Sequence, residues 1–192
     1  DPENNASAKR KIGAFYRAWL DEDALEQKQL APIDTELTAI DQAQSHHDII
    51  KLFASLNALG VDSPINFWVG QDDKDSTRYA VFFTQSGLGL PDRDYYFDDS
   101  ERGQEILNAY KAFIIQILEL ANIGDIDAAA ASAQSIINLE TQLADHQWNK
   151  VANRDSEKTY NKFSAKQLET TLNQYNFTEF ATGLGVNNQA DY

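Results

Sequence analysis

The chain has 192 residues, of which 42% are hydrophobic, so it is long enough to bury a core of its own or to form part of a larger protein. Its formal net charge is -14, which argues against a nucleic-acid partner because such a chain repels phosphate backbones. It has no Cys, which excludes disulfides, thiolate metal sites and Cys nucleophiles, and no apolar run long enough for a transmembrane segment.

Three amphipathic helices are predicted before residue 61. In the first, Phe15 and Trp19 lie one helical turn apart and share an apolar face. Ser45 is the N-cap candidate of the third, and Gly60 ends it because glycine takes the left-handed conformation without strain. The expected ranges are residues 3–20, 33–43 and 46–59.

A β-hairpin is predicted at about residues 65–85. Two short runs rich in aromatic and β-branched residues, 67–69 and 79–83, are typical of strands. The polar residues 71–76 between them favour a turn, and we expect a longish loop there.

An irregular segment follows the hairpin, from Ser86 to Phe97. Gly87 and Gly89 can supply positive φ, and Pro91 biases the residue before it away from the helical region. We therefore expect a fixed crossing, with the next helix beginning only after it.

Helices fill the rest of the predicted fold. Ser100 is expected to cap the first of them, Asp125 or Asp127 the second, Ser164 the third and Thr178 the last. The prediction is a mainly α fold, a multi-helix lobe with one small embedded hairpin, with residues 1–192 as a single helical domain. The expected helices are residues 101–122, 128–152, 164–175 and 178–184.

Three stretches of the sequence are similar to the N-terminal region of the neprilysin/PepO family of zinc metallopeptidases. Residues 87–96 read GLGLPDRDYY and resemble the family's L-G-L-P-x-R-D-Y-Y. Residues 159–164 resemble its Y-N-K/P-M-[ST], with Phe163 in place of the usual Met. Residues 14–17 resemble a weaker segment, after which Ala18-Trp19 replaces a position where the animal members carry Cys.

This resemblance implies a two-lobed helical zinc endopeptidase whose second lobe closes over a large internal cavity. The chain resembles part of that N-terminal, cavity-forming lobe. The lack of Met indicates a processed protein or an excised fragment, and the resemblance implies a fragment of a longer parent. The parent is expected to bind Zn, to cleave peptides and small polypeptides, and to pack its catalytic lobe against this region. A stand-alone, non-enzymatic helical binding module is the alternative that the sequence leaves open.

No catalytic, cofactor-binding or metal-binding residue is assigned within the chain. A peptidase of this type needs two His one helical turn apart, in H-E-x-x-H, so that both reach one zinc ion. The chain's three histidines, His46, His47 and His146, lack this spacing. We therefore expect zinc ligands outside this chain, an inactive fragment, and His46 and His47 on the surface. A Cys-free member of the family suggests the bacterial periplasm or cell envelope, without excluding the cytoplasm.

Two acidic clusters and the aromatic residues near them each have two interpretations. Residues 72–75 are either a calcium loop or, as we expect because the Glu and Gly of such a loop are missing, a solvated turn. The carboxylates of residues 92–99 either form a polar wall of a substrate cavity or, as we expect, pair with Arg93 in a connector. The aromatic residues around the hairpin are expected to form a core rather than to stack on a ligand. Apolar surface that faces the catalytic lobe in the parent is expected to make the fragment self-associate weakly.

Overall fold

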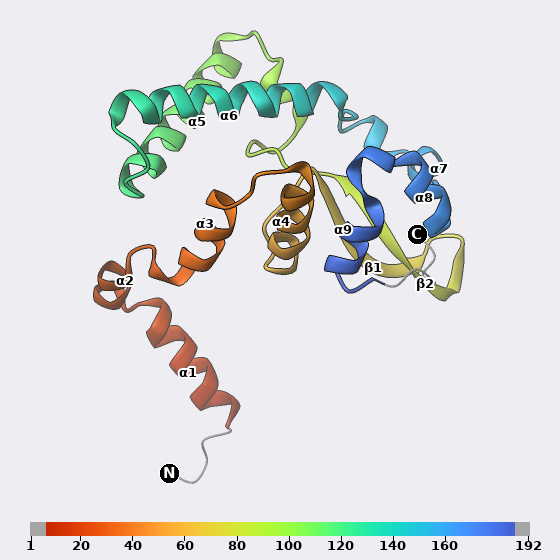
Figure 1. The fold of residues 1–192 in the computed structure, drawn as a ribbon, viewed down its shortest axis with the longest axis horizontal. Coiled ribbons are helices and arrows are strands. Elements are labelled where there is room, and N and C mark those ends of the chain that lie inside the picture. The colour runs from red at the N-terminus through yellow and green to blue at the C-terminus, as the bar shows by residue number, and fades with distance from the viewer. Residues whose placement is uncertain (1–6, 187–192) are drawn as a thin grey trace. The chain divides into compact units, whose positions relative to one another are not determined.

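The computed structural model describes residues 7–186, which form two compact units that divide after Gln42. Helices predominate in both units (Figure 1). Within the described residues, the β-structure is one sheet, a two-stranded antiparallel hairpin. The predicted mainly α fold with a small hairpin at residues 65–85 is confirmed.

Polar side chains set the helix starts in the first unit. The Ser7 hydroxyl and the Asp21 carboxylate each accept a hydrogen bond from a backbone N–H in the first turn of the helix that follows. The helix predicted over residues 3–20 therefore begins at Ala8, and residues 3–6 of that prediction lie outside the described part. The elements of this unit are α1 (Ala8–Trp19), α2 (Glu22–Lys28), a 3₁₀ turn (Ala31–Ile33) and α3 (Asp34–Asp41).

The second unit contains the hairpin and six more helices of the described residues. Ser45, Ser100, Asp125 and Ser164 cap helices as predicted, each accepting from a backbone N–H three residues on. The helices are α4 (His46–Ala58), α5 (Glu101–Leu120), α6 (Ile126–His146), α7 (Ser156–Thr159), α8 (Ala165–Thr171) and α9 (Phe177–Gly183).

Helix α6 ends at His146, before the predicted end at residue 152. The Asn149 side-chain oxygen accepts from the backbone N–H of Val151 at 3.1 Å and of Ala152 at 2.9 Å. Such local bonds offer the backbone an alternative to the helical pattern, so a separate 3₁₀ turn (Ala152–Arg154) forms instead.

The last two helices also differ from the prediction. Helix α8 ends at Thr171 and is followed by a 3₁₀ turn, so it does not run on as an α-helix through Tyr175. Asn176 has a left-handed backbone with φ of 50° and stands directly before α9. Thr178 therefore lies inside α9, and the prediction that it caps this helix is wrong.

The hairpin consists of β1 (Ile65–Asp72) and β2 (Asp75–Gln85), in antiparallel register with Phe67 opposite Phe83. A tight turn joins the strands where a longish loop was expected. The turn is held by the Asp72 carboxylate, which accepts from the Lys74 backbone N–H at 2.9 Å. A register irregularity after Gln71 accommodates the extra residues of β2.

One face of the hairpin packs on the last helices of the chain. Val81 of β2 lies in a buried cluster with Leu168 of α8 and Phe177 of α9. Phe83 packs against this cluster and against a second one that joins α4 to α9, with its ring 5.4 Å from that of Phe177.

The expected aromatic core is confirmed for Phe67, which packs against the first cluster, and for Tyr96, which is buried. It is wrong for Trp68 and Phe97, which are 49% and 44% exposed.

Helices α5 and α6 pack side by side in a third buried cluster (Figure 1). It contains Ile114 of α5, and Ala133 and Ile137 of α6. Ala129 and Ala133 are fully buried, because alanine side chains let the neighbouring backbone approach closely.

Candidate functional site: the contacts of the motif segments

Asp72 joins the hairpin to the motif segment that contains Tyr160 and Lys162. It is buried at the end of β1, with 4% of its surface exposed. Its carboxylate accepts hydrogen bonds from Lys162 Nζ at 2.7 Å and from Tyr160 Oη at 2.8 Å, besides the Lys74 backbone N–H. These donors, led by Lys162, hold the pKa of Asp72 well below its usual range. Asp72 is therefore an ionised anchor between distant parts of the sequence.

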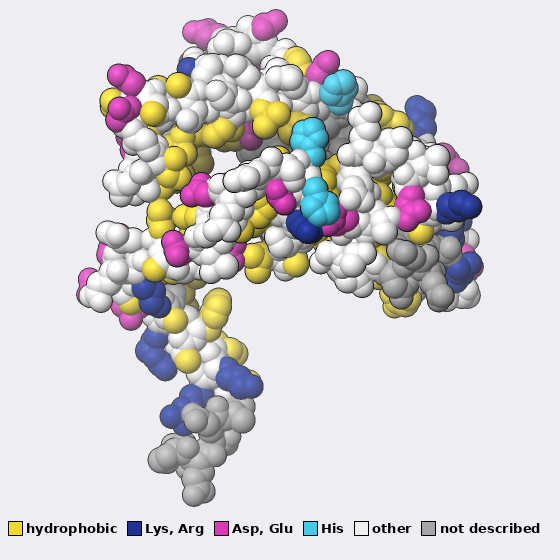
Figure 2. All heavy atoms as spheres, viewed as in Figure 1, with side chains coloured by type: hydrophobic (Ala, Val, Ile, Leu, Met, Phe, Trp, Pro, Cys, Tyr) yellow, Lys and Arg dark blue, Asp and Glu magenta, His cyan; other side chains and the backbone are white. Residues whose placement is uncertain are grey.

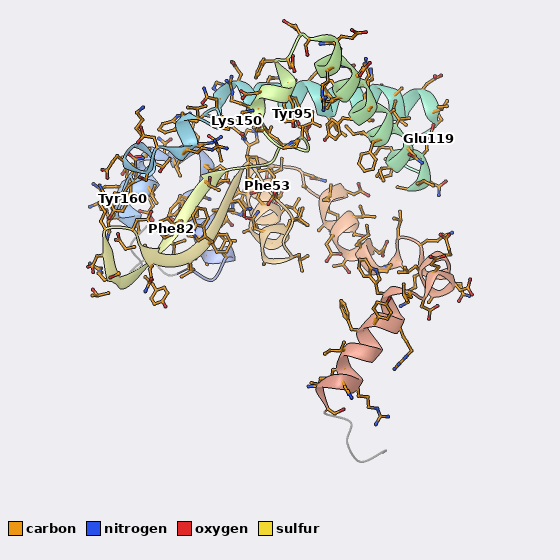
Figure 3. The ribbon with its side chains drawn as sticks, turned by 180° about the vertical axis from the view of Figure 1, so that it is seen from behind. Phe53, Phe82, Tyr95, Glu119, Lys150 and Tyr160 are labelled. Carbon is orange, nitrogen blue, oxygen red and sulfur yellow. The ribbon has the colours of Figure 1, made fainter. Side chains whose placement is uncertain are left out.

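Lys74 adds a second connection at the same end of the hairpin. Its ammonium group lies 2.9 Å from Glu157 Oε2 and 4.6 Å from the centre of the Tyr160 ring. The bond to Glu157 raises the pKa of Lys74. Figure 3 shows Tyr160 beside the hairpin that carries Phe82.

The acidic residues of the cluster 72–75 differ in their exposure to solvent. Asp73 and Asp75 are exposed, and Asp75 Oδ1 accepts from the Thr77 backbone N–H at 3.1 Å and its hydroxyl at 2.6 Å. These contacts are typical of a solvated turn. The prediction is wrong for Asp72, which is buried and bonded to Lys162. The ammonium group already neutralises this carboxylate, which weighs against the calcium-loop alternative.

Two glycines let the segment of residues 86–97 lie close to its neighbours. Gly87 has a φ of +83°, and a Cβ there would lie 3.0 Å from the Pro64 backbone. A Cβ at Gly89 would lie 1.8 Å from Tyr110 Oη. Both positions therefore require glycine for space, and Gly87 requires it also for its positive φ. Gly89 does not adopt a positive φ, so that expectation is wrong for it.

Arg93 of this segment binds the end of α6 rather than a carboxylate. Its Nε donates to the Ala144 carbonyl at 2.8 Å, and its guanidinium group lies 4.9 Å from the centre of the Phe97 ring. Among the described residues, the cation near Asp92 and Asp94 is Lys150, at 3.8 and 3.6 Å. Figure 3 shows Lys150 near Tyr95 of the segment. The expected connector is present, but the prediction that Arg93 supplies its ion pairs is wrong.

Glu140 of α6 holds the segment from the other side. Its carboxylate accepts from Tyr96 Oη at 2.7 Å and from Tyr110 Oη at 3.0 Å. Burial raises the pKa of Tyr96, and burial with the nearby Glu140 charge raises the pKa of Tyr110 to about 12. Glu140 was not predicted as a contact of this segment. The available signal was a lone acidic residue in the buried stripe of α6, at helical spacing from Ile137 and Ala144.

A groove of about 710 Å³ runs along the motif segment. Residues 86–93 and residues 147–154 contribute most of its lining. Asp92 and Lys150 both line it and form an ion pair with each other. The groove thus presents charges of both signs together with backbone groups of the glycine-rich segment.

The three histidines do not assemble into a metal site. His46 and His47 are exposed in the first turn of α4, as expected, and His47 Nδ1 contacts the Glu179 carboxylate. His146 is exposed at the end of α6. Within residues 7–186, no group of three or more His, Asp or Glu side chains could hold a metal ion. The described residues therefore do not fit a zinc ion.

The weaker motif segment, residues 14–17, lies in α1, where Phe15 and Tyr16 are exposed.

None of the helices in the described part of the chain combines the length and apolar composition that a membrane crossing requires.

Comparisons with known proteins agree with the motif resemblance. The model of the family described as Peptidase family M13 matches residues 1–192. Endothelin-converting enzyme 1 of Cavia porcellus is 30% identical over 164 residues, which cover 81% of this chain and 21% of that protein. Endothelin-converting enzyme-like 1 of Rattus norvegicus is 32% identical over 151 residues, which cover 72% of this chain and 19% of that protein.

Solved structures with the same fold include a bacterial zinc metalloprotease. The zinc metalloprotease ZMP1 of Mycobacterium tuberculosis, in complex with an inhibitor, aligns with a TM-score of 0.84 and 38% identity. The alignment covers 91% of this chain and 26% of that one. In its partial open state the same protease aligns with a TM-score of 0.72 over 98% of this chain. The chain thus spans about a fifth to a quarter of the length of these relatives.

Proposed function

Since the chain belongs to peptidase family M13, the neprilysin type of zinc metallopeptidase, and corresponds to the N-terminal region of its members, we propose that it helps to enclose the substrate cavity of a larger zinc endopeptidase. Residues 1–192 form part of the non-catalytic, cavity-forming lobe. The parent cleaves peptides and small polypeptides with a zinc ion held outside this chain. Residues 1–192 alone are inactive.

The observation that carries this proposal is that side chains of both motifs form hydrogen bonds within the chain. Arg93 and Tyr96 of the first motif bind α6, and Tyr160 and Lys162 of the second bind Asp72. Side chains bonded in this way fix the position of a segment and do not act on a substrate. Both motifs therefore support a role in the shape of the lobe.

The groove beside the first motif supports the proposal that this region forms a wall of the substrate cavity. Its lining offers charges of both signs, from Lys150 and Asp92, and a glycine-rich backbone. A peptide substrate has termini of both charges and amide groups along its length, so such a surface is compatible with it. A bacterial periplasmic or cell-envelope location is proposed because this member of the family has no Cys.

The test uses the full-length parent and a peptide inhibitor that binds zinc and carries a photoreactive group at each end. If this region encloses the cavity, irradiation attaches the inhibitor to residues 1–192, and excess unlabelled peptide prevents the attachment. Attachment confined to the rest of the parent would contradict the cavity role. Peptide cleavage that a chelator does not inhibit would contradict the zinc endopeptidase assignment.

A further inference from the structure

A pocket of about 330 Å³ lies where the hairpin meets the second motif segment, residues 159–164. Trp68 and Phe82 line it from the hairpin, and Tyr160 and Phe163 line it from the motif segment. Figure 3 labels Phe82 and Tyr160 at this end of the second unit. The volume is at the lower end of the range for small-molecule sites, and such sites are also mainly apolar with a few polar groups. The pocket therefore suits one small chemical group.

Trp68 and Phe82 give this pocket an aromatic wall. Their rings are stacked, with centroids 5.1 Å apart and planes inclined by 5°. Trp68 is 49% exposed, so the stack leaves much of the indole ring open to a ligand. The face of an aromatic ring is electronegative, and the indole of Trp attracts cations more strongly than the rings of Tyr or Phe.

The charged groups of the pocket also favour a cation. Asp72 and Lys162 both line it, but they neutralise each other across 2.7 Å. Asp73 lines it too and is exposed, and no ion pair of the described residues involves its carboxylate. The remaining charge of the lining is therefore negative. The net charge of -14, with Asp and Glu side chains spread over the face shown in Figure 2, attracts cations over longer distances.

One cation of the chain already lies on an aromatic residue of this pocket. The Lys74 ammonium group is 4.6 Å from the centre of the Tyr160 ring, and Glu157 supplies its counter-charge at 2.9 Å. Trp68 and Asp73 offer the same combination of an aromatic ring and a carboxylate, without a cation of the described chain paired to that carboxylate.

We propose that this pocket binds an organic cation, a guanidinium or ammonium group on a short apolar stem. Trp68 covers the face of the cation, and Asp73 supplies its counter-charge. The ligand is either a free amine or guanidine, or the side chain of an Arg or Lys in a peptide, and both present the same chemistry. The inference does not depend on the proposed function, because every residue that it uses lies in this chain.

The first test uses the full-length parent labelled with 5-fluorotryptophan, in which Trp68→Phe identifies the fluorine signal of position 68. N-acetylarginine amide should shift this signal to saturation. N-acetylcitrulline amide has the same shape without the charge and should bind at least about tenfold more weakly. Equal binding of the two compounds, or a Trp68 signal that responds to neither, would overturn the proposal. Tighter binding of acetyl-Ala-Arg-Ala amide would identify a peptide side chain as the ligand, and equal or weaker binding a free guanidine or amine.

The second test locates the counter-charge by titration calorimetry with N-acetylarginine amide. Asp73→Asn in the full-length parent should weaken binding about two- to fivefold, the contribution of one exposed ion pair. Asp127→Asn is the matched control, because it makes the same change at an exposed carboxylate of α6 that does not line the pocket. Trp68→Leu should weaken binding about tenfold, and Asp73→Asn keeps the test valid if that variant fails to fold. Equal affinities of the Asp73→Asn and Asp127→Asn variants would refute the assigned site.

Discussion

The Lys162 ammonium group lies 2.7 Å from the Asp72 carboxylate, although 90 residues separate the two in the sequence. Asp72 is buried at the end of β1 and Lys162 belongs to the second motif. The pair therefore fixes the tip of the hairpin against the segment that leads into α8. Removing this ion pair should therefore lower the stability of the second unit.

Asp72→Asn should lower the Tm of the chain by several degrees. The amide keeps the size of the carboxylate but removes the negative charge that the Lys162 ammonium group contacts at 2.7 Å. Asp73→Asn is the matched control, because the neighbouring carboxylate is exposed. Thermal melts followed by circular dichroism give both values, and equal Tm values for the two variants would contradict the anchoring role.

The contribution of Asp72 should disappear in acid. The pKa of Asp72 is lower in the folded chain than in the unfolded chain, so its stabilisation is present above the unfolded pKa of about 4 and is lost as the pH falls through the folded value. The difference in Tm between the original chain and Asp72→Asn should therefore shrink steadily below about pH 4. A difference that stays constant from neutral pH to pH 2 would show that Asp72 does not titrate in this way.

Gly89→Ala should destabilise the chain by about 1–3 kcal/mol, as overpacking does. The added Cβ would lie 1.8 Å from Tyr110 Oη, so either the segment or the tyrosine must move. Gly13→Ala is the control, because it adds the same methyl group inside a helix where the nearest atom is the flexible end of Arg17. Urea denaturation should show a loss for Gly89→Ala alone, and a stable Gly89→Ala variant would disprove the close contact.

Glu140→Gln should let Tyr96 and Tyr110 ionise at lower pH. Burial and the Glu140 charge raise the pKa of both phenols, to about 12 for Tyr110, and the substitution removes the charge. Because these folded values lie above the unfolded value of about 10, stability should fall as the pH rises from about 10 to 12. The absorbance of ionised tyrosine measures the titration. The control variant Glu119→Gln changes an exposed site and should leave the ionisation of Tyr96 and Tyr110 unchanged.

Arg93→Lys should cost about 1.5–3 kcal/mol of unfolding free energy, the range for a hydrogen bond to a charged group. Lysine lacks the planar guanidinium group that donates to Ala144 and stacks on Phe97. Arg102→Lys, at an exposed site of α5, is the control with the same change of side chain. Equal denaturation midpoints for the two variants would show that Arg93 is not a structural tie.

The sequence predicts those parts of the fold that depend on neighbouring residues. Ser45, Ser100 and Ser164 begin helices because a cap is formed within three residues. The burial of Asp72 could not be predicted in this way, because its partners are supplied from 88 and 90 residues along the chain. A local pattern of acidic residues is the same for a solvated turn and for a buried anchor.

The candidate site was predictable to a similar extent. The glycines of residues 86–97 indicated a fixed, irregular crossing, and the structure shows which atoms approach them. The partners of Arg93 were not predictable, because a backbone carbonyl such as that of Ala144 leaves no mark in the sequence. Weak self-association of the fragment stays a prediction.

The long separation between Asp72 and Lys162 has a consequence for synthesis of the chain. At about 5–20 residues per second, a ribosome needs roughly 5–20 s to pass from Asp72 to Lys162, and longer to reach α9. During that interval Val81 lacks Leu168 and Phe177, the residues of α8 and α9 that cover it in the folded chain. The nascent hairpin is therefore a site where we expect chaperones to bind before the rest of its core emerges.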